Sequence, residues 1–196
     1  MRVKLFFATV ILLAMAAMAI SQEKQERVRI PLQRMQPGQT SVPLQPGEKV
    51  ICVGASAFQP LISGYNLNRR GWILSLSAFT PDMLSVVFTA PVILPHNARI
   101  TRLILLCYDN SSDENKEVSL LMRYAENTAP PASTNARNVC RVDSSGAADQ
   151  VRLVQTTDMT EDLVDNVNAF YWLELYLMGV HREFRFYHAK IYYRED

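Results

Sequence analysis

The sequence predicts an all-β protein, an antiparallel β-sandwich of the jelly-roll kind with about nine strands. Two observations support this prediction. Short runs rich in β-branched and aromatic residues recur along the chain, and Pro, Gly, Asn or Asp residues suited to turns separate them. There is also no βαβ alternation of the kind that builds a parallel α/β enzyme. We expect at most one helical turn, within Met159–Val167.

The predicted strands share short length and apolar character, and the best of them alternate. In Val118–Tyr124, apolar residues occupy every second position, which is typical of a strand with one face in the core. The complete set is Lys49–Val53, Trp72–Leu76, Leu84–Thr89, Arg99–Tyr108, Val118–Tyr124, Val139–Val142, Val151–Thr156, Phe170–Met178 and Phe184–Arg194.

The N-terminal residues have the composition of an export signal. Arg2 and Lys4 precede an uncharged apolar run, and small residues suited to cleavage follow it. Because the run is shorter than the roughly 20 residues of a bilayer span, we expect cleavage rather than a membrane anchor. The chain then divides into a signal peptide (1–21), an extended Pro- and Gly-containing arm (22–47) and one β-sandwich domain (48–196). We expect the mature protein to be secreted or periplasmic, at the cell exterior, with no membrane span.

The arm contains two Gln-Pro-Gly triplets, at 36–38 and 45–47. Pro presets the φ angle of a type II turn and Gly accepts the positive φ that follows, so each triplet predicts such a turn. The arm is expected either to pack on the domain or to reach a neighbouring molecule.

The charge balance excludes one class of partner. The formal net charge is +1, and loss of Arg2 and Lys4 with the signal leaves about −1. A nucleic-acid-binding surface needs a clear excess of Lys and Arg. We therefore expect no nucleic-acid partner.

Three cysteines, Cys52, Cys107 and Cys140, lie outside the predicted signal. An oxidising compartment permits disulfides, but an odd number allows at most one bridge within the chain. Two alternatives follow: a Cys107–Cys140 disulfide, or buried and unreactive thiols.

No motif in the sequence predicts catalysis or a cofactor. HExxH, CxxC, GxSxG and phosphate-binding loops are all missing, and the three histidines have no metal-ligand spacing. Side chains with oxygen ligands are concentrated at residues 109–115 and at Asp165-Asn166, and a Ca²⁺-binding site is one interpretation of each segment. Without an EF-hand spacing, turns closed by the Asp and Asn side chains are the better interpretation. We expect no enzyme activity, no cofactor and no metal.

The last two predicted strands carry the most informative pattern. Alternation in Phe170–Met178 turns Trp172, Glu174, Tyr176 and Met178 away from the core. In the final strand the same rule turns His188, Lys190 and Tyr192 outward. It also turns Phe184 and Phe186 outward, unless a β-bulge near Tyr187 shifts the alternation. If the two strands pair, one sheet face carries the binding or interface residues Trp172, Glu174, Tyr176, Phe184, Phe186, His188 and Tyr192.

Such a surface predicts a binding function, because monomers seldom expose large apolar patches. The N-terminal arm is one candidate cover. A subunit interface of a homo-oligomer, such as a trimer, or an extracellular protein partner is a second. The third is a glycan stacked on the rings. We predict a secreted, non-catalytic β-sandwich that self-associates or binds a partner, with a carbohydrate-binding module as the alternative.

One series of motifs resembles uncharacterised secreted bacterial proteins. Residues 90–100 (APVILPHNARI) are similar to their pattern APV-x-LP-x-GA-x-I, and residues 107–112 (CYDNSS) are similar to a strand ending in YDNS. Asp165-Asn166 and a closing aromatic strand follow in the same order. Asn97 stands where that pattern has Gly, and Asn tolerates the left-handed region well. The resemblance implies a β-sandwich and export, with no catalytic residues.

Overall fold

The computed structural model describes residues 42–61, 67–70, 73–76, 85–111, 118–127, 136–144, 148–178 and 184–195. The predicted signal peptide and most of the predicted arm, including its first Gln-Pro-Gly triplet, lie outside these ranges. Within them, no helix is both long enough and apolar enough to cross a bilayer.

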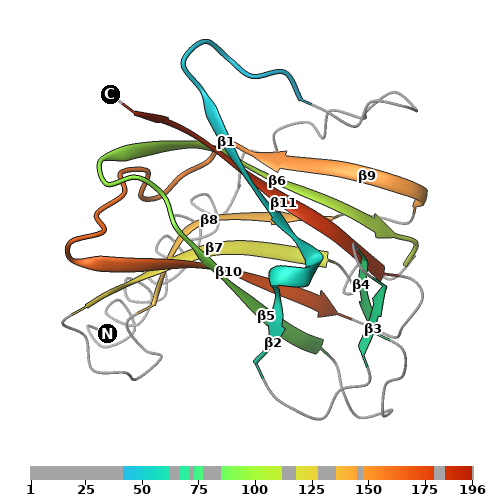
Figure 1. The fold of residues 1–196 in the computed structure, drawn as a ribbon. Coiled ribbons are helices and arrows are strands. Elements are labelled where there is room, and N and C mark those ends of the chain that lie inside the picture. Colours follow the sequence, from blue (N-terminus) through green and yellow to red (C-terminus); the bar gives the residue numbers. More distant parts are fainter. Residues whose placement is uncertain are drawn as a thin grey trace, which may run out of the picture. The chain divides into compact units, whose positions relative to one another are not determined.

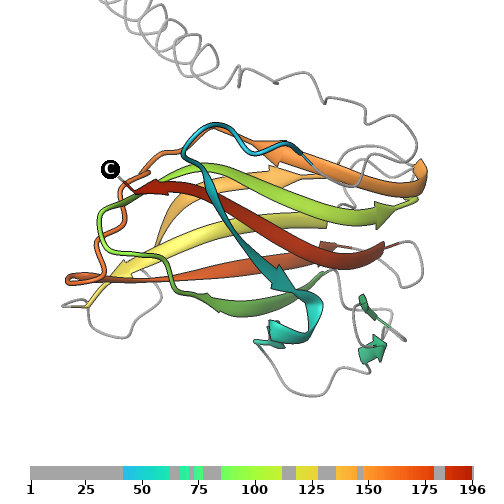
Figure 2. The same ribbon diagram turned by 45° about the horizontal axis from the view of Figure 1, so that its top comes forward.

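Two antiparallel sheets face each other and enclose the hydrophobic core, so the predicted β-sandwich is confirmed (Figures 1 and 2). The six-stranded sheet has the order β3-β4-β11-β6-β9, with β1 also paired to β11. The five-stranded sheet has the order β2-β5-β10-β7-β8. A short 3-10 helix at Ala55–Ala57 follows β1. The strands are β1 Lys49–Gly54, β2 Gln59–Pro60, β3 Leu67–Arg70, β4 Ile73–Leu76, β5 Ser85–Val92, β6 Ala98–Asp109, β7 Val118–Glu126, β8 Arg137–Asp143, β9 Ala148–Thr156, β10 Ala169–Met178 and β11 Phe184–Glu195.

Every predicted strand is present, and the short strands β2 and β3 are additional. The segment Met159–Val167, where we expect at most one helical turn, contains no helix; a single turn closes at its end, where the Ala169 N–H donates to Asp165 O at 2.9 Å. Backbone hydrogen bonds tie this segment to β6: the Ile100 N–H donates to Asp162 O at 2.7 Å, and the Val164 N–H donates to Ala98 O at 2.9 Å. Leu163 forms an isolated bridge with Arg99. Residues 162–164 stay extended because their backbone groups bond to this neighbouring strand.

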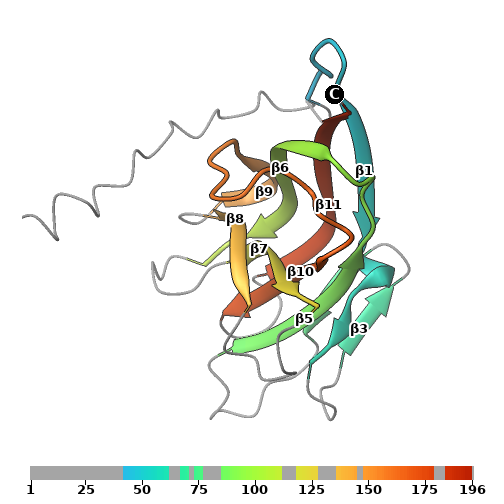
Figure 3. The same cartoon turned by 90° about the vertical axis from the view of Figure 1, so that its left-hand side faces the viewer.

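The last two strands do not pair with each other, so the condition for one shared aromatic face is not met. β10 lies between β5 and β7 in the five-stranded sheet, whereas β11 pairs with β6, β1 and β4 in the other sheet. Figure 3 shows the two strands in opposite layers. Each strand has one apolar face, and each turns that face to the core from its own side.

A β-bulge explains the positions of Phe184 and Phe186. The register between β11 and β6 shifts between Phe186 and His188, which leaves Tyr187 as the extra residue. Phe184 and Phe186 are 2% and 0% exposed and belong to the core, where Phe186 packs edge-on against Phe58 at 4.8 Å between ring centroids. The outward placement predicted for these two rings is therefore wrong, and the bulge considered near Tyr187 is present.

The end of the arm crosses the outer face of the six-stranded sheet. Gly47 has a φ of 76°, and the Glu48 N–H donates to Gln45 O at 3.0 Å, as the predicted Gln-Pro-Gly turn requires. Upstream of this turn, Val42 packs against a cluster of Ile104, Leu153 and Tyr192. Tyr192 faces outward as predicted but is only 2% exposed. Of the candidate covers for the outward aromatic residues, the arm is therefore the one that covers Tyr192.

A buried ion pair holds this crossing in place. Arg102 Nη2 lies 2.5 Å from Glu48 Oε2 and donates to Pro43 O at 3.1 Å, while its Cζ lies 4.2 Å from the Tyr192 ring centroid. Glu48 also accepts hydrogen bonds from the Gln45 N–H and the Thr101 hydroxyl. Burial by itself raises the pKa of Glu48, but these hydrogen bonds and the Arg102 charge outweigh it and hold the pKa below 4.5.

We expect Arg102→Met to lower the free energy of unfolding by about 3 kcal/mol, because it leaves the Glu48 carboxylate buried without its cation. The exposed Lys49–Glu195 pair supplies the matched control: Lys49→Met should change stability by less than about 1 kcal/mol. Urea unfolding at pH 7 measures both. Adding Glu48→Gln to Arg102→Met should recover part of the loss, and equal effects of the two single variants would contradict the burial argument.

Candidate functional site

The candidate site is the outer face of the five-stranded sheet along its central strand. In β10, the alternate residues Tyr171, Leu173, Leu175 and Leu177 are between 0% and 6% exposed and form part of the core. The residues between them must therefore point outward. Four outward residues of β10 and one neighbour on β7 form what we call the β10 face: Phe170, Trp172, Glu174, Tyr176 and Arg123.

Aromatic rings dominate this face. Phe170, 54% exposed, stacks on Trp172 with 5.1 Å between ring centroids and 23° between ring planes. Arg123 is the direct cross-strand neighbour of Trp172, and its Cζ lies 5.9 Å from the Trp172 ring, within the range of a cation–π contact. Guanidinium, indole and phenyl groups thus lie together, and the phenyl ring is the most accessible of them.

The Glu174 carboxylate is the polar centre of the β10 face. It accepts hydrogen bonds from Trp172 Nε1 at 2.9 Å and from the Tyr176 hydroxyl at 2.8 Å. Arg123 Nη1 donates to both carboxylate oxygens at 2.9 and 3.0 Å, and its Nη2 donates to Ala136 O. A carboxylate with this many donors fixes the orientation of both neighbouring aromatic side chains.

The electrostatics of Glu174 suit an anionic anchor for its neighbours and do not suit a general acid. Burial raises its pKa, but the hydrogen bonds from Trp172, Arg123 and Tyr176 and the Arg123 charge outweigh it and hold the pKa below 4.5. Burial and the bond to Glu174 raise the pKa of Tyr176. At neutral pH Glu174 is therefore an anion and Tyr176 a hydrogen-bond donor. A general acid would need a carboxyl pKa shifted upward, toward the working pH.

The structure brings together only part of the predicted site. Trp172, Glu174 and Tyr176 are adjacent as predicted. Phe184 and Phe186 lie in the core, and Tyr192 lies under the arm. His188 is on the other sheet, in β11, opposite Gly54 of β1. It is half-buried, and burial together with the charge of Lys190 lowers its pKa.

Two residues of the β10 face were missed in the sequence. Phe170 shares the parity of Trp172, so extending the alternation by one step would have found it. Arg123 lies on the outward side of its own strand, but only the pairing of β7 with β10 places it beside Trp172. Ile93, 85% exposed, follows the last paired residue of β5 and adds an apolar side chain at the same end of the sheet.

Of the two alternatives for the cysteines, the Cys107–Cys140 disulfide is not present. Cys107 lies in β6 of one sheet and Cys140 in β8 of the other, and all three thiols are free. Burial raises the pKa of each of these two thiols to about 12, which keeps them protonated and unreactive. Cys52, by contrast, is exposed, so the buried-thiol alternative holds for two of the three.

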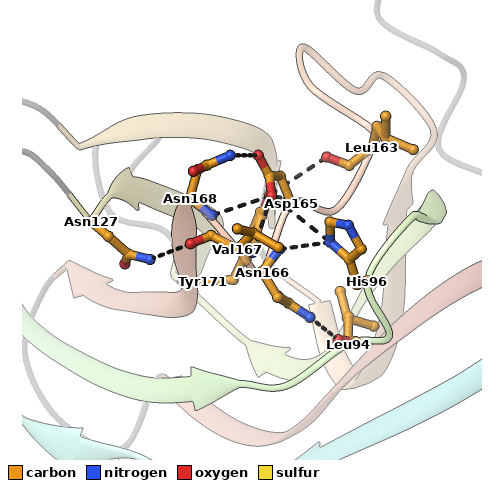
Figure 4. Close-up of polar contacts among 9 residues, drawn as sticks. All are labelled: Leu94, His96, Asn127, Leu163, Asp165, Asn166, Val167, Asn168 and Tyr171. Carbon is orange, nitrogen blue, oxygen red and sulfur yellow. Dashed lines mark hydrogen bonds and ion pairs between the residues drawn. The ribbon is translucent and has the colours of Figure 1, made fainter.

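The loop before β10 is held by the turn chemistry that the sequence predicts. The Asp165 carboxylate accepts hydrogen bonds from the backbone N–H groups of Val167 and Asn168 and from Asn168 Nδ2 (Figure 4). The Asp165 N–H donates to the Tyr171 hydroxyl at 2.9 Å, and His96 Nδ1 lies 3.8 Å from Asp165 Oδ1. These contacts fix the entry of the chain into β10, immediately before Phe170.

The other oxygen-rich segment also begins with a side-chain-closed turn. Asp109 is 1% exposed and accepts the Ser111 N–H at 3.1 Å; it also bonds the Ser144 hydroxyl and lies 3.3 Å from Arg152 Nη2. Residues 112–115 lie outside the described ranges. Among the residues that are described, no three His, Cys, Asp or Glu side chains converge to hold a metal ion.

No protein-family model matches this chain, and no curated protein matches it in sequence. Among solved structures, it is similar to the xylan-binding module CBM15 with 15% identity and a TM-score of 0.48, over 76% of this chain and 100% of that one. A family 29 carbohydrate-binding module from Piromyces equi gives 13% identity and a TM-score of 0.39, over 74% and 89%. A structure of infectious bursal disease virus (Gt strain) has 11% identity and a TM-score of 0.35, over 85% of this chain and 38% of that one. Because one fold supports many unrelated functions, the function of this chain must come from its own side chains.

The low pKa of Glu174 predicts how stability responds to acid. A carboxyl group whose pKa is lower in the folded state contributes stability above the unfolded pKa of about 4.5, and this contribution is lost as pH falls through the folded pKa. We expect Glu174→Gln to be less stable than the parent at pH 7 and the gap to narrow below pH 4. Thermal unfolding between pH 3 and pH 7 measures this gap, and a constant gap would contradict the hydrogen-bonded anion.

The burial of two cysteines predicts their reactivity. We expect a brief iodoacetamide pulse under native conditions to alkylate Cys52 and to leave Cys107 and Cys140 unmodified until the protein unfolds, because only Cys52 is exposed. Mass spectrometry of peptides identifies the labelled sites. A Cys107–Cys140 bridge in the native protein would contradict the free-thiol structure.

Proposed function

We propose that this chain is a non-catalytic binding protein whose β10 face binds carbohydrate. One observation supports this most directly: Phe170, Trp172 and Tyr176 occupy outward positions of one central strand, and the buried Glu174 carboxylate between Trp172 and Tyr176 orients these two rings. We further propose that binding takes place outside the cytoplasm, since residues 1–21 carry the predicted signal.

Carbohydrate recognition needs two kinds of group side by side. The C–H faces of a pyranose ring pack on exposed aromatic rings, while its hydroxyls need hydrogen-bonding groups held in fixed directions. The β10 face offers both, because Phe170 is exposed and Tyr176, Glu174 and Arg123 form one connected polar network. Since that network holds the rings before any ligand arrives, binding costs less side-chain ordering.

The binding test uses the mature chain and a panel of soluble polysaccharides. We expect at least one to retard the protein in affinity gel electrophoresis, and Trp172→Ala to weaken that binding by at least tenfold, or about 1.4 kcal/mol. Isothermal titration calorimetry gives the affinity. Val151→Ala is the matched control, because Val151 is 49% exposed on a strand of the other sheet; it should leave binding unchanged.

Self-association through the same face is the alternative that the exposed Phe170 and Ile93 side chains favour. Light scattering over a concentration series distinguishes the two functions. A monomer that binds a polysaccharide through Trp172 supports carbohydrate binding. A dimer or trimer that Phe170→Ser dissociates, together with no binding to any polysaccharide of the panel, would overturn it.

A further inference from the structure

We infer that the ligand is an unbranched chain of several sugar units lying along β5, beside the rings of β10, rather than one terminal sugar. This inference rests on the proposed carbohydrate-binding function and specifies the form and path of the ligand. It follows from an asymmetry between the two strands that flank β10.

On one side of β10 the outward side chains are short. Val87, Thr89 and Pro91 of β5 lie directly opposite Tyr176, Glu174 and Trp172. Their neighbours in sequence, Val86, Phe88 and Ala90, are at most 1% exposed and belong to the core, so the outward direction of the three is set by the alternation. We call these three residues the β5 strip.

On the other side of β10 long side chains fill the surface. Arg123 of β7 is bonded to Glu174 and to Ala136 O, and Leu121 beside it is only 8% exposed. Next to Leu121, Arg141 of β8 donates to Ser119 Oγ at 3.1 Å and to Asp143 Oδ1 at 2.6 Å. Ion pairs and hydrogen bonds thus already occupy the β7–β8 side, whereas a ligand over the β5 strip displaces no ion pair.

A row of polar side chains also crosses the β5 strip. Gln59 of β2 is opposite Thr89, and Thr89 is opposite Glu174. An amide, a hydroxyl and a carboxylate therefore lie in one cross-strand row beneath any ligand resting on the strip. Leu61, 64% exposed and bonded through its N–H to Val87 O at 2.9 Å, borders the strip on its far side.

The apolar groups continue along the strand instead of converging on one point. From Tyr176 to Phe170 the strand rises about 20 Å at its usual spacing, several times the width of one pyranose ring. Pro91 is exposed opposite Trp172, and Ile93 is 85% exposed beyond it. A linear surface of this length matches a linear ligand, whereas a terminal sugar would need its contacts gathered at a single place.

The first test is a length series of oligosaccharides prepared from the polysaccharide that binds best. In isothermal titration calorimetry we expect affinity to increase at least tenfold from the monosaccharide to the longest oligomer and then to level off. Phe170→Ala should weaken the binding of long oligomers more than that of the shortest oligomer that binds, because Phe170 lies at one end of the row of rings. Equal affinity for monosaccharide and oligomer would overturn the inference while leaving carbohydrate binding intact.

The second test blocks the β5 strip. We expect Thr89→Tyr to reduce affinity for the long oligomer at least tenfold, and the milder Val87→Gln to reduce it measurably if Thr89→Tyr proves unstable in thermal unfolding. Arg141→Ala, on the opposite side of β10, is the control and should keep affinity within twofold. If Trp172→Ala abolishes binding but neither β5 variant weakens it, the proposed function stands and the path along β5 is wrong.

Discussion

The burial of alternate residues in β10 is the constraint on which the rest of the site depends. Leu173, Leu175 and Leu177 are completely buried at the centre of the sandwich, and a one-residue slip of the register would move all of them to the surface. The strand is paired on both sides, with β5 and with β7, so it has no free edge along which to shift. Trp172 and Tyr176 consequently have one direction open to them, and the loop held by Asp165 and Tyr171 defines where this strand begins.

A buried carboxylate then turns these outward side chains into an ordered surface. Leaving Glu174 without partners would be costly, because an unpaired charge loses its hydration on burial. Arg123 Nη1, which donates to both carboxylate oxygens, and the two aromatic donors replace that hydration. These bonds also hold the indole and phenol groups in defined positions. The same interactions explain the low pKa of the carboxyl group, so one arrangement accounts for both the ionisation state and the geometry.

The two outer faces of the sandwich differ in the exposure of their aromatic residues. On the six-stranded sheet, the chain at Val42 and Pro43 covers Tyr192, and the Arg102–Glu48 pair fastens it there. On the five-stranded sheet, Phe170 keeps more than half of its surface exposed. Apolar surface that a protein does not cover with its own chain is a common mark of a binding site. This difference is our reason for placing the proposed binding face on the sheet that contains β10 and not on the sheet that contains β11.

The sequence by itself determined the local structure: the strands, the inward and outward sets of β10, the turn at Gly47 and the tolerance of a positive φ at Asn97, whose φ is 66°. Period-two burial and turn chemistry act over a few residues, so they can be seen in the order of the residues. Only the tertiary structure decided which strands pair, that Tyr187 is a bulge, and that the arm covers Tyr192. These features separated Phe184, Phe186 and Tyr192 from Trp172, and they brought Arg123 beside it. They depend on contacts between residues far apart in the chain, where the packing of two sheets chooses among pairings that the local pattern permits equally.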